Sequence, residues 1–396
     1  MVVFLHGLLL LISLPGLLGI FYLFFLTLLS QRLEQSKPTS TPNYRFEIII
    51  PAHNEESVIK RLLTNLKQLD WPQSQLRITV IADNCNDKTA EIARASGAQV
   101  FERNNPTQRG KGYALSYGLS KCFQDDFAQA IVILDADSEV SPTLLHAFAY
   151  CLEHKAPAVQ AHYGVLNPND NWRTRLQTMA YGAFHGVRSR ARERLNVSCG
   201  LRGNGMAFSR ELLETHPLNV YSLAEDIEYG VQLGLAGIRV CYSEEAWVNA
   251  DLPTAAKSAQ SQRHRWEKGR YLVARQYLAP LLKKAFTQRS RVCLDLAFDL
   301  LTLPLAYLAL NLFVVALIAG VLSPFYPSLL LWLAIVFGSY CLLAIHVFRG
   351  WQLSPLGPSA LLELLRAPFF IGWKIIVLLR QRKTTDWVRT DREHRD

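Results

Sequence analysis

Apolar residues gather toward the two ends of the chain. Residues 2–29 are almost wholly apolar, with His6, Ser13 and Thr27 as the polar interruptions. A helix needs about 20 apolar residues to cross the hydrocarbon core of a bilayer. The pattern therefore predicts a transmembrane anchor over residues 1–30. A cleaved signal peptide is the alternative, but signal peptides have a basic N-terminal region and a shorter apolar run than this one.

The second apolar region begins near residue 300. Two apolar runs, 300–322 and 329–347, are separated by the turn-forming sequence Ser-Pro-Phe-Tyr-Pro. Long apolar runs joined by a Pro-rich turn are typical of a membrane hairpin. We therefore expect a transmembrane hairpin over residues 300–348.

Two flanking regions mix apolar with basic positions. Residues 271–299 combine Leu and Tyr with Lys and Arg, as do helices that lie on a membrane surface. The stretch 367–379 is short for a span and contains Lys374. We therefore expect an interfacial helix region at 271–299, and an interfacial or re-entrant segment with a basic cytosolic tail over 349–396.

The middle of the chain alternates between strand and helix patterns. Short apolar runs at 46–50, 78–81 and 130–134 end in polar loops, and residues 58–69 carry apolar positions at helical spacing. This alternation predicts an α/β domain over residues 44–270, with a mostly parallel sheet flanked by helices. Ligands of such sheets bind beyond the carboxyl ends of the strands.

The charge and the cysteine content restrict the binding partners and the cellular compartment of the protein. The 396 residues carry a formal net charge of +9. The sequence lacks a nucleic-acid-binding signature, and its basic residues cluster beside the apolar segments, which favours contact with membrane lipids rather than nucleic acid. Arg32 and Lys37 follow the anchor and place the domain on the cytoplasmic side. The seven scattered cysteines suggest reduced thiols rather than a disulfide framework. Protein partners cannot be inferred from these features.

Acidic residues follow the predicted strands. Asp135 and Asp137 come directly after the run 130–134, and paired carboxylates suit Mg²⁺ or Mn²⁺ bridged to phosphates; a polar turn is the plain alternative. Asp83 ends another strand, where it could hold a nucleoside or cap a helix. Glu225 and Asp226 could supply a general base or simply favour a helix start.

Three further features complete the candidate site. Glu55 follows the first strand, at the position for a ribose. Lys111 lies between two glycines that would let the backbone approach a phosphate. Gln262, Arg265 and Trp266 share one face if they are helical, and suit a phosphate and a sugar ring; a basic helix end near a membrane is the alternative.

In this order, the segments resemble the inverting family 2 glycosyltransferases with the GT-A fold. The resemblance is to the membrane-integrated branch, which includes cellulose, hyaluronan and poly-N-acetylglucosamine synthases, and it rests on the Asp-Ala-Asp, Glu-Asp and Gln-x-x-Arg-Trp elements. Ala224 stands where cellulose synthases have Thr, and the chain has fewer predicted spans than those enzymes.

The resemblance implies a role for each residue. Glu55, Asp83, Lys111 and Asp135 would bind the UDP-sugar, Asp137 would bind Mg²⁺ or Mn²⁺, and Asp226 would be the catalytic base. Glu225, Gln262, Arg265 and Trp266 would bind the acceptor and the leaving diphosphate.

The resemblance implies inverting transfer of a sugar from a UDP-sugar to a glycan or lipid acceptor, with polysaccharide synthesis as the first expectation and two alternatives beside it. The Gln-x-x-Arg-Trp element favours polysaccharide synthesis at the cytoplasmic face of a bacterial inner membrane. The small membrane part favours a synthase that adds one sugar to a diacylglycerol, ceramide-like or polyprenyl acceptor. The second alternative is a non-enzymatic membrane scaffold or transporter subunit, which would bind no nucleotide sugar.

Overall fold

The computed structural model describes residues 1–33, 44–366, 369 and 372, without the side chains of 256 and 257. Its central feature is an eight-stranded sheet of order β3-β2-β1-β4-β7-β6-β8-β5. The strands are β1 (Phe46–Ala52), β2 (Leu76–Asp83), β3 (Gln99–Arg103), β4 (Ala130–Ile133), β5 (Ser138–Val140), β6 (Ala158–Val165), β7 (Met206–Ser209) and β8 (Val240–Ala250).

The strand directions determine where the ends of the sheet converge. β3, β2, β1 and β4 run parallel, as do β6 and β8, whereas β7 and β5 are antiparallel to their neighbours. The expected mostly parallel α/β sheet is therefore confirmed. Because β1, β2 and β4 are parallel neighbours, the polar segments that follow them meet at one edge.

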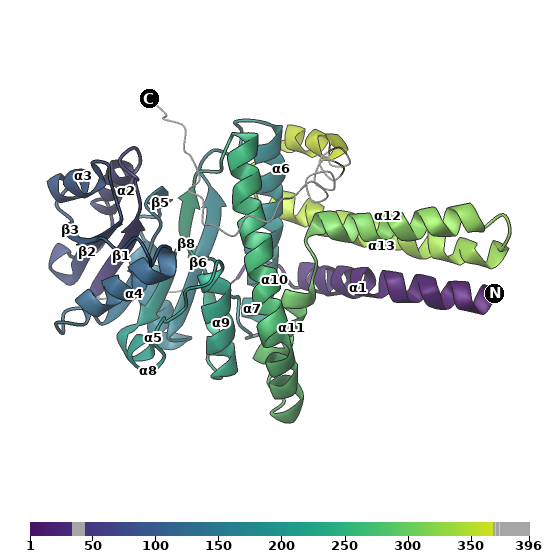
Figure 1. The fold of residues 1–396 in the computed structure, drawn as a ribbon, viewed down its shortest axis with the longest axis horizontal. Helices are drawn as coiled ribbons and strands as arrows, with labels where there is room; N and C mark the ends of the chain where they lie inside the picture. The colour runs from purple at the N-terminus through teal and green to yellow at the C-terminus, as the bar shows by residue number, and fades with distance from the viewer. Residues whose placement is uncertain (34–43, 367–368, 370–371, 373–396) are drawn as a thin grey trace.

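Helices cover both faces of this sheet (Figure 1). One face packs against α2 (Ile59–Leu66), α3 (Thr89–Ala95) and α5 (Leu144–His154). The other packs against α4 (Lys111–Cys122), α8 (Arg210–Thr215) and α9 (Glu225–Leu235). α2 buries apolar side chains at positions i, i+3, i+4 and i+7, which is the spacing of an amphipathic helix on a core.

A second layer of helices joins the sheet to the apolar helices. It consists of α6 (Trp172–Tyr181), a turn of π-helix η2 (Gly182–Val187), α7 (Arg188–Arg194), α10 (Ala256–Thr287) and α11 (Arg291–Leu301). The 32-residue α10 continues through residue 271, where the sequence-based scheme places a domain boundary. Its amphipathic second half and its Gln-x-x-Arg-Trp element therefore belong to one helix.

Among the described residues, three helices are long and apolar enough to cross a membrane: α1 (Val2–Leu28), α12 (Leu305–Leu322) and α13 (Leu330–Gln352, preceded by one 3₁₀ turn). They lie side by side and project away from the sheet (Figure 1). Small residues allow close packing, since a Cβ on Gly16 would lie 2.1 Å from the Asn311 side-chain oxygen.

The remaining elements are short or fall outside the described chain. Short 3₁₀ segments lie at η1 (Gln73–Gln75), η3 (Pro327–Leu329) and η4 (Pro358–Arg366). The stretch expected to be interfacial or re-entrant at 367–379, apart from residues 369 and 372, and the basic tail lie outside the described residues. All seven cysteines are unpaired; Cys341 is exposed and Cys85 is half-buried.

Candidate active site

A cavity of about 860 Å³ opens at the carboxyl edge of the parallel strands. All ten residues selected from the sequence line it: Glu55, Asp83, Lys111, Asp135, Asp137, Glu225, Asp226, Gln262, Arg265 and Trp266. They come from strand ends, loops and helices up to 211 positions apart in the chain. The predicted convergence of these side chains is therefore present in the structure, while their individual chemical roles remain proposals.

The nucleoside end of the predicted site is already structured by internal contacts. Asp83 is buried and pairs with Arg103 at 2.6 Å. Asn84 follows it with a positive φ of 52°, and its side chain donates a hydrogen bond to Asp83. The Nδ1 atom of His53 lies 2.7 Å from the Asp83 carbonyl oxygen. These contacts fix the strand end that a nucleoside would approach.

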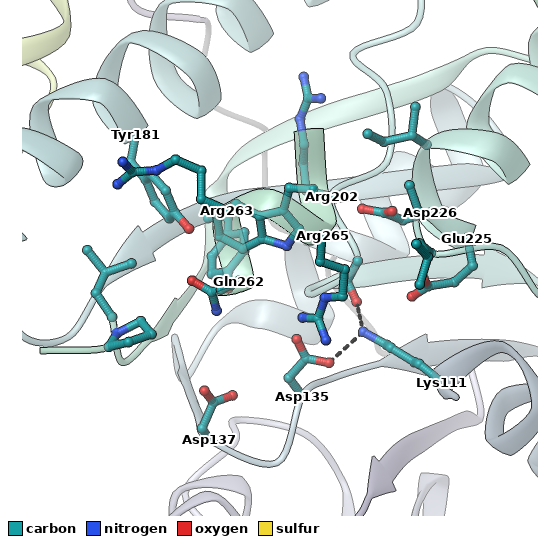
Figure 2. Close-up of a pocket in the computed structure, with 18 of the residues that line it drawn as sticks. Lys111, Asp135, Asp137, Tyr181, Arg202, Glu225, Asp226, Gln262, Arg263 and Arg265 are labelled. Atoms are coloured by element: carbon teal, nitrogen blue, oxygen red, sulfur yellow. Dashed lines mark hydrogen bonds and ion pairs between the residues drawn. The ribbon is translucent and has the colours of Figure 1, made fainter. Parts of the chain in front are cut away.

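A buried asparagine holds the Asp-Ala-Asp turn. The Asn204 side-chain oxygen accepts a hydrogen bond from the backbone N–H of Asp135 at 3.0 Å. Its amide nitrogen donates to Ser138 at 2.9 Å. The Lys111 ammonium lies 2.5 Å from the Asp135 carboxylate and also donates to the Gly203 carbonyl, as Figure 2 shows. The turn, Lys111 and the segment around Gly203 therefore form one rigid unit.

Close backbone packing places Glu225 and Asp226 beside this unit. A Cβ on Gly112 would lie 2.1 Å from the Val220 carbonyl oxygen, so the loop before α9 lies directly on α4. Tyr113 of α4 stacks on Tyr221 of that loop at a ring distance of 4.3 Å.

The opposite side of the acidic pair is held by α10 and by a glycine. Gly269 of α10 packs against Ala224, the residue that precedes the pair. Gly203 has a φ of +79°, and a Cβ there would lie 3.2 Å from the Asp226 carboxylate. The acidic pair is therefore confined between α4, α10 and this glycine.

Burial and neighbouring charges perturb the three ionisable groups at this point. Burial raises the pKa of Asp226 overall, although the backbone N–H of Ile227 and the Lys111 charge oppose the rise. Burial and the charge of Asp226 raise the pKa of Glu225. Burial alone would lower the pKa of Lys111, but the charges of Asp135 and Glu225 raise it overall. Such perturbation in a cavity is typical of acid–base chemistry.

α10 contributes more side chains than the predicted face. Gln262, Arg265 and Trp266 line the cavity as expected, and Trp266 stays 36% exposed. In Figure 2 the Arg265 guanidinium is directed toward Asp135. Three further side chains of the same helix also line the cavity: Arg263, Glu267 and Arg270. The cavity therefore contacts two adjacent faces of α10.

Sequence reasoning missed Arg202, which lines the cavity in a glycine-rich segment. Its backbone N–H donates to the buried Gln160 at 2.8 Å, and Gly200, Gly203 and Gly205 around it all have positive φ. Repeated glycines near a polar residue, here between α7 and β7, indicate close backbone approach. That signal was present in the sequence.

The cavity also extends to the apolar helices. Leu23 of α1, Leu305 and Ala306 of α12 and His346 of α13 line it together with the acidic residues. The Thr27 hydroxyl lies 2.7 Å from the His346 ring, which joins α1 to α13 near this point. One continuous space thus connects the acidic edge of the sheet with the three candidate membrane spans.

A divalent cation fits this site only if a substrate completes its coordination. Within the described part of the chain, no group of three or more His, Cys, Asp or Glu side chains is arranged to hold a metal. Asp137 and Asp135 line the cavity as an oxygen-donor pair. Mg²⁺ and related ions often bind one or two carboxylates plus substrate phosphates. The donor set therefore fits Mg²⁺ or Mn²⁺ bound with a diphosphate.

The sheet, its flanking helices and the acidic edge define the class of GT-A-like folds. The family described as "Glycosyltransferase like family 2" matches residues 42–269. The chain therefore belongs to family 2 of the glycosyltransferases.

Two curated relatives extend this assignment. The probable glycosyltransferase YdaM of Bacillus subtilis is 26% identical over 265 residues, which are 65% of this chain and 62% of the relative. The beta-monoglucosyldiacylglycerol synthase of Trichormus variabilis is 30% identical over 250 residues, which are 61% of this chain and 52% of the relative. The chain thus matches between half and two thirds of the length of these relatives.

One solved structure matches almost the whole chain. The mannosyltransferase PcManGT from Pyrobaculum calidifontis, in complex with GDP-Man and Mn²⁺, superposes with a TM-score of 0.57 and 18% identity. The match covers 93% of this chain and 99% of that chain. The shared fold therefore extends beyond the sheet and its flanking helices.

Proposed function

We propose that the chain transfers a hexose from a UDP-sugar, with inversion, to a hydroxyl of a lipid acceptor at the cytoplasmic membrane face. The observation that supports this most directly is the single cavity, which contains both the acidic residues and side chains of all three candidate spans. A lipid headgroup could reach Asp226 there while its apolar chains stay against α1 and α12. The name of the Trichormus relative, a glycolipid synthase, agrees with this acceptor class.

The reaction is a single displacement. The acceptor oxygen attacks the anomeric carbon, its proton passes to the Asp226 carboxylate, and the bond from that carbon to the diphosphate oxygen breaks. The raised pKa of Asp226 makes it a stronger base than an exposed aspartate. Arg265 would stabilise the leaving diphosphate.

Other residues bind and orient the donor. Asp83 and Glu55 would hold the nucleoside end, and Lys111 with Asp135 would lie along the diphosphate. A divalent cation at Asp137 would supply charge neutralisation for the departing diphosphate. Every other contact in this scheme comes from side chains that line the cavity.

Substitution of the base tests the mechanism. We expect Asp226→Asn to lower transfer by about 10³-fold or more, because an asparagine amide cannot take the acceptor proton. Binding of UDP with Mn²⁺, measured by calorimetry, should stay within about twofold. Near-normal turnover in this variant would contradict the role of Asp226. Absence of UDP binding to the unmodified chain would favour the scaffold alternative.

Polysaccharide synthesis remains the second candidate. It is favoured by the position of Gln262, Arg265 and Trp266 in the cavity, since the element they form is the one shared with polysaccharide synthases. A glucomannan 4-beta-mannosyltransferase from Arabidopsis thaliana, 24% identical over 253 residues, is also among the relatives. Mass spectrometry of products made in nanodiscs separates the two, because a glycan series indicates extension and a single added hexose indicates glycolipid synthesis.

A further inference from the structure

Four arginines, two of them buried and two half-buried, form a cluster between the acidic residues and the apolar helices. Arg188 and Arg192 come from α7, Arg202 from the glycine-rich segment and Arg270 from α10. Arg188, Arg202 and Arg270 line the cavity. The guanidinium groups of Arg188 and Arg202 both lie over the ring of Phe184, at 4.5 Å and 4.1 Å from its centre. We refer to these four residues as the arginine cluster.

Two carboxylates of α11 neutralise only part of this charge. Arg192 pairs with Asp295 at 3.1 Å and with Asp299 at 2.8 Å. Arg188 pairs with Asp299 as well. The ion pairs of the cluster therefore join two positive charges to two negative charges, and the two other arginines take no part in them.

The two other arginines bond mainly to backbone carbonyl oxygens. Arg270 donates to the carbonyl oxygens of Asp299 and Thr302, the latter at 2.9 Å. Arg202 donates to the Cys199 carbonyl oxygen at 2.9 Å. The buried Nε atoms of Arg188 and Arg202 have no hydrogen-bond partner among the described residues. Neutral acceptors do not balance a charge that is partly removed from water, so a bound anion would stabilise these two guanidinium groups.

Burial and the excess positive charge lower the pKa values of three of the four arginines. Burial and the nearby charge of Arg192 lower the pKa values of Arg202 and Arg270 to about 10 and that of Arg188 further. A bound anion would relieve both effects, because opposite charge favours the ionised guanidinium. Phosphate oxygens match the planar array of guanidinium donors.

The cluster is directed toward the membrane part of the cavity rather than toward the donor part. Arg270 contacts the backbone of Thr302, three residues before α12 begins. Figure 2 shows the Arg202 guanidinium directed away from Asp135 and Asp137. Arg202 is nevertheless within electrostatic reach of Asp226. The cluster thus lies between the proposed base and the candidate spans.

We propose that the arginine cluster binds a phosphate group of the acceptor, so that the acceptor is a phosphate-bearing lipid with a free hydroxyl. This inference rests on the proposed function and narrows its acceptor class. The hydroxyl faces Asp226, the phosphate contacts Arg202 and Arg270, and the apolar chains run along Leu23 and Leu305. The phosphate remains unchanged in the reaction. Phosphatidylglycerol and a sugar on a polyprenyl diphosphate share this chemistry, whereas diacylglycerol does not.

The test uses the full chain in phosphatidylcholine nanodiscs with UDP-glucose, UDP-galactose or UDP-N-acetylglucosamine and Mn²⁺. The discs contain phosphatidylglycerol, polyprenyl-diphosphate-linked N-acetylglucosamine or diacylglycerol. We expect transfer to one of the two phosphate-bearing lipids, and the active one identifies the source of the phosphate. Preference for diacylglycerol would overturn this inference and leave the proposed function standing. Extension of a soluble glycan with no lipid product would overturn both.

Variants locate the phosphate site. Arg202→Gln and Arg270→Gln should each raise KM for the phosphate-bearing lipid by about tenfold or more, since each removes a charge-assisted hydrogen bond. KM for the donor should stay within about twofold. The matched control is Arg210→Gln on α8, a residue that pairs with Glu214 and does not line the cavity. A rise in donor KM alone would assign the cluster to the donor diphosphate and overturn the inference. If the variants fail to fold, the lipid preference of the unmodified chain still decides whether the acceptor carries a phosphate.

Discussion

At the residue scale, the site combines the proposed base Asp226 with the cation Lys111 and with Gly203, where a side chain would crowd the Asp226 carboxylate. Lys111 contacts Asp135 and the Gly203 carbonyl, and its charge also acts on Asp226. Gly203 leaves room for the Asp226 carboxylate. The position of the base and its basicity therefore depend on the same small group of atoms.

A change at Lys111 should move the pH dependence of the reaction. Its positive charge opposes the rise in the pKa of Asp226, so Lys111→Gln should raise that pKa further. Asp226 must be ionised to accept a proton, and the acid limb of the kcat/KM profile should therefore shift to higher pH. Lys121→Gln on the same helix, where Lys121 lies near Phe101 and Tyr117, is the control. An unmoved acid limb in Lys111→Gln would contradict this assignment.

Sequence patterns predicted the acidic residues better than the arginines. Asp135, Asp137 and Asp226 stand after apolar runs or at helix starts, so local chemistry marks them, and all line the cavity. Arg202 and Arg270 lie about 70 positions apart, and the carboxylates that pair with the arginine cluster come from a different helix, α11. Arg188 and Arg192 lie four residues apart on one helix, but no local period or spacing links them to Arg202 and Arg270. Only the packing of α7, α10 and α11 brings the cluster together.

At the element scale, α10 connects the cavity with the helices α9 and α11. Its first half lines the cavity, and its second half packs against α9 and α11. The sequence predicted a helix in both halves but placed a boundary between them, because the apolar pattern changes near residue 271. The continuous helix shows that the change reflects a new packing partner rather than a new element.

Close contact between α10 and α9 should be necessary for activity. A Cβ on Gly269 would lie 2.7 Å from the Cβ of Ala224. Gly269→Ala should shift α10 relative to Asp226 and lower kcat by about tenfold or more, since small displacements of reacting groups are costly. The double variant Gly269→Ala with Ala224→Gly should recover most of the activity. If the single variant keeps full kcat, or the double variant recovers nothing, this packing argument is wrong.

At the scale of the whole molecule, the sheet and the apolar helices share one cavity. The predicted anchor and hairpin correspond to three candidate spans, and the sequence could show them because each needs only length and apolar composition. It could not show that side chains of all three spans line the same cavity as the acidic residues. That arrangement depends on contacts between residues some 300 positions apart, such as Thr27 with His346.

The packing of α1 on α12 should determine the stability of this arrangement. A side chain on Gly16 would collide with Asn311, whose amide donates to the Ile12 carbonyl oxygen at 2.9 Å. Gly16→Leu should therefore destabilise the chain by about 1–3 kcal/mol and lower its unfolding temperature in nanodiscs. Gly7→Leu on the same helix, where a Cβ meets nothing within 4 Å, is the matched control. Equal unfolding temperatures for the two variants would exclude this close packing.

The continuous space from the strand ends to the candidate spans has a kinetic consequence. The nucleotide sugar would reach the cavity by diffusion through water, in three dimensions. The lipid acceptor would reach it by lateral diffusion within the bilayer, in two dimensions. Turnover should then follow the mole fraction of acceptor within the bilayer rather than its amount per volume of solution. Dilution of the acceptor with inert lipid should slow the enzyme, whereas dilution of the whole vesicle suspension at constant nucleotide sugar should leave the rate per enzyme unchanged.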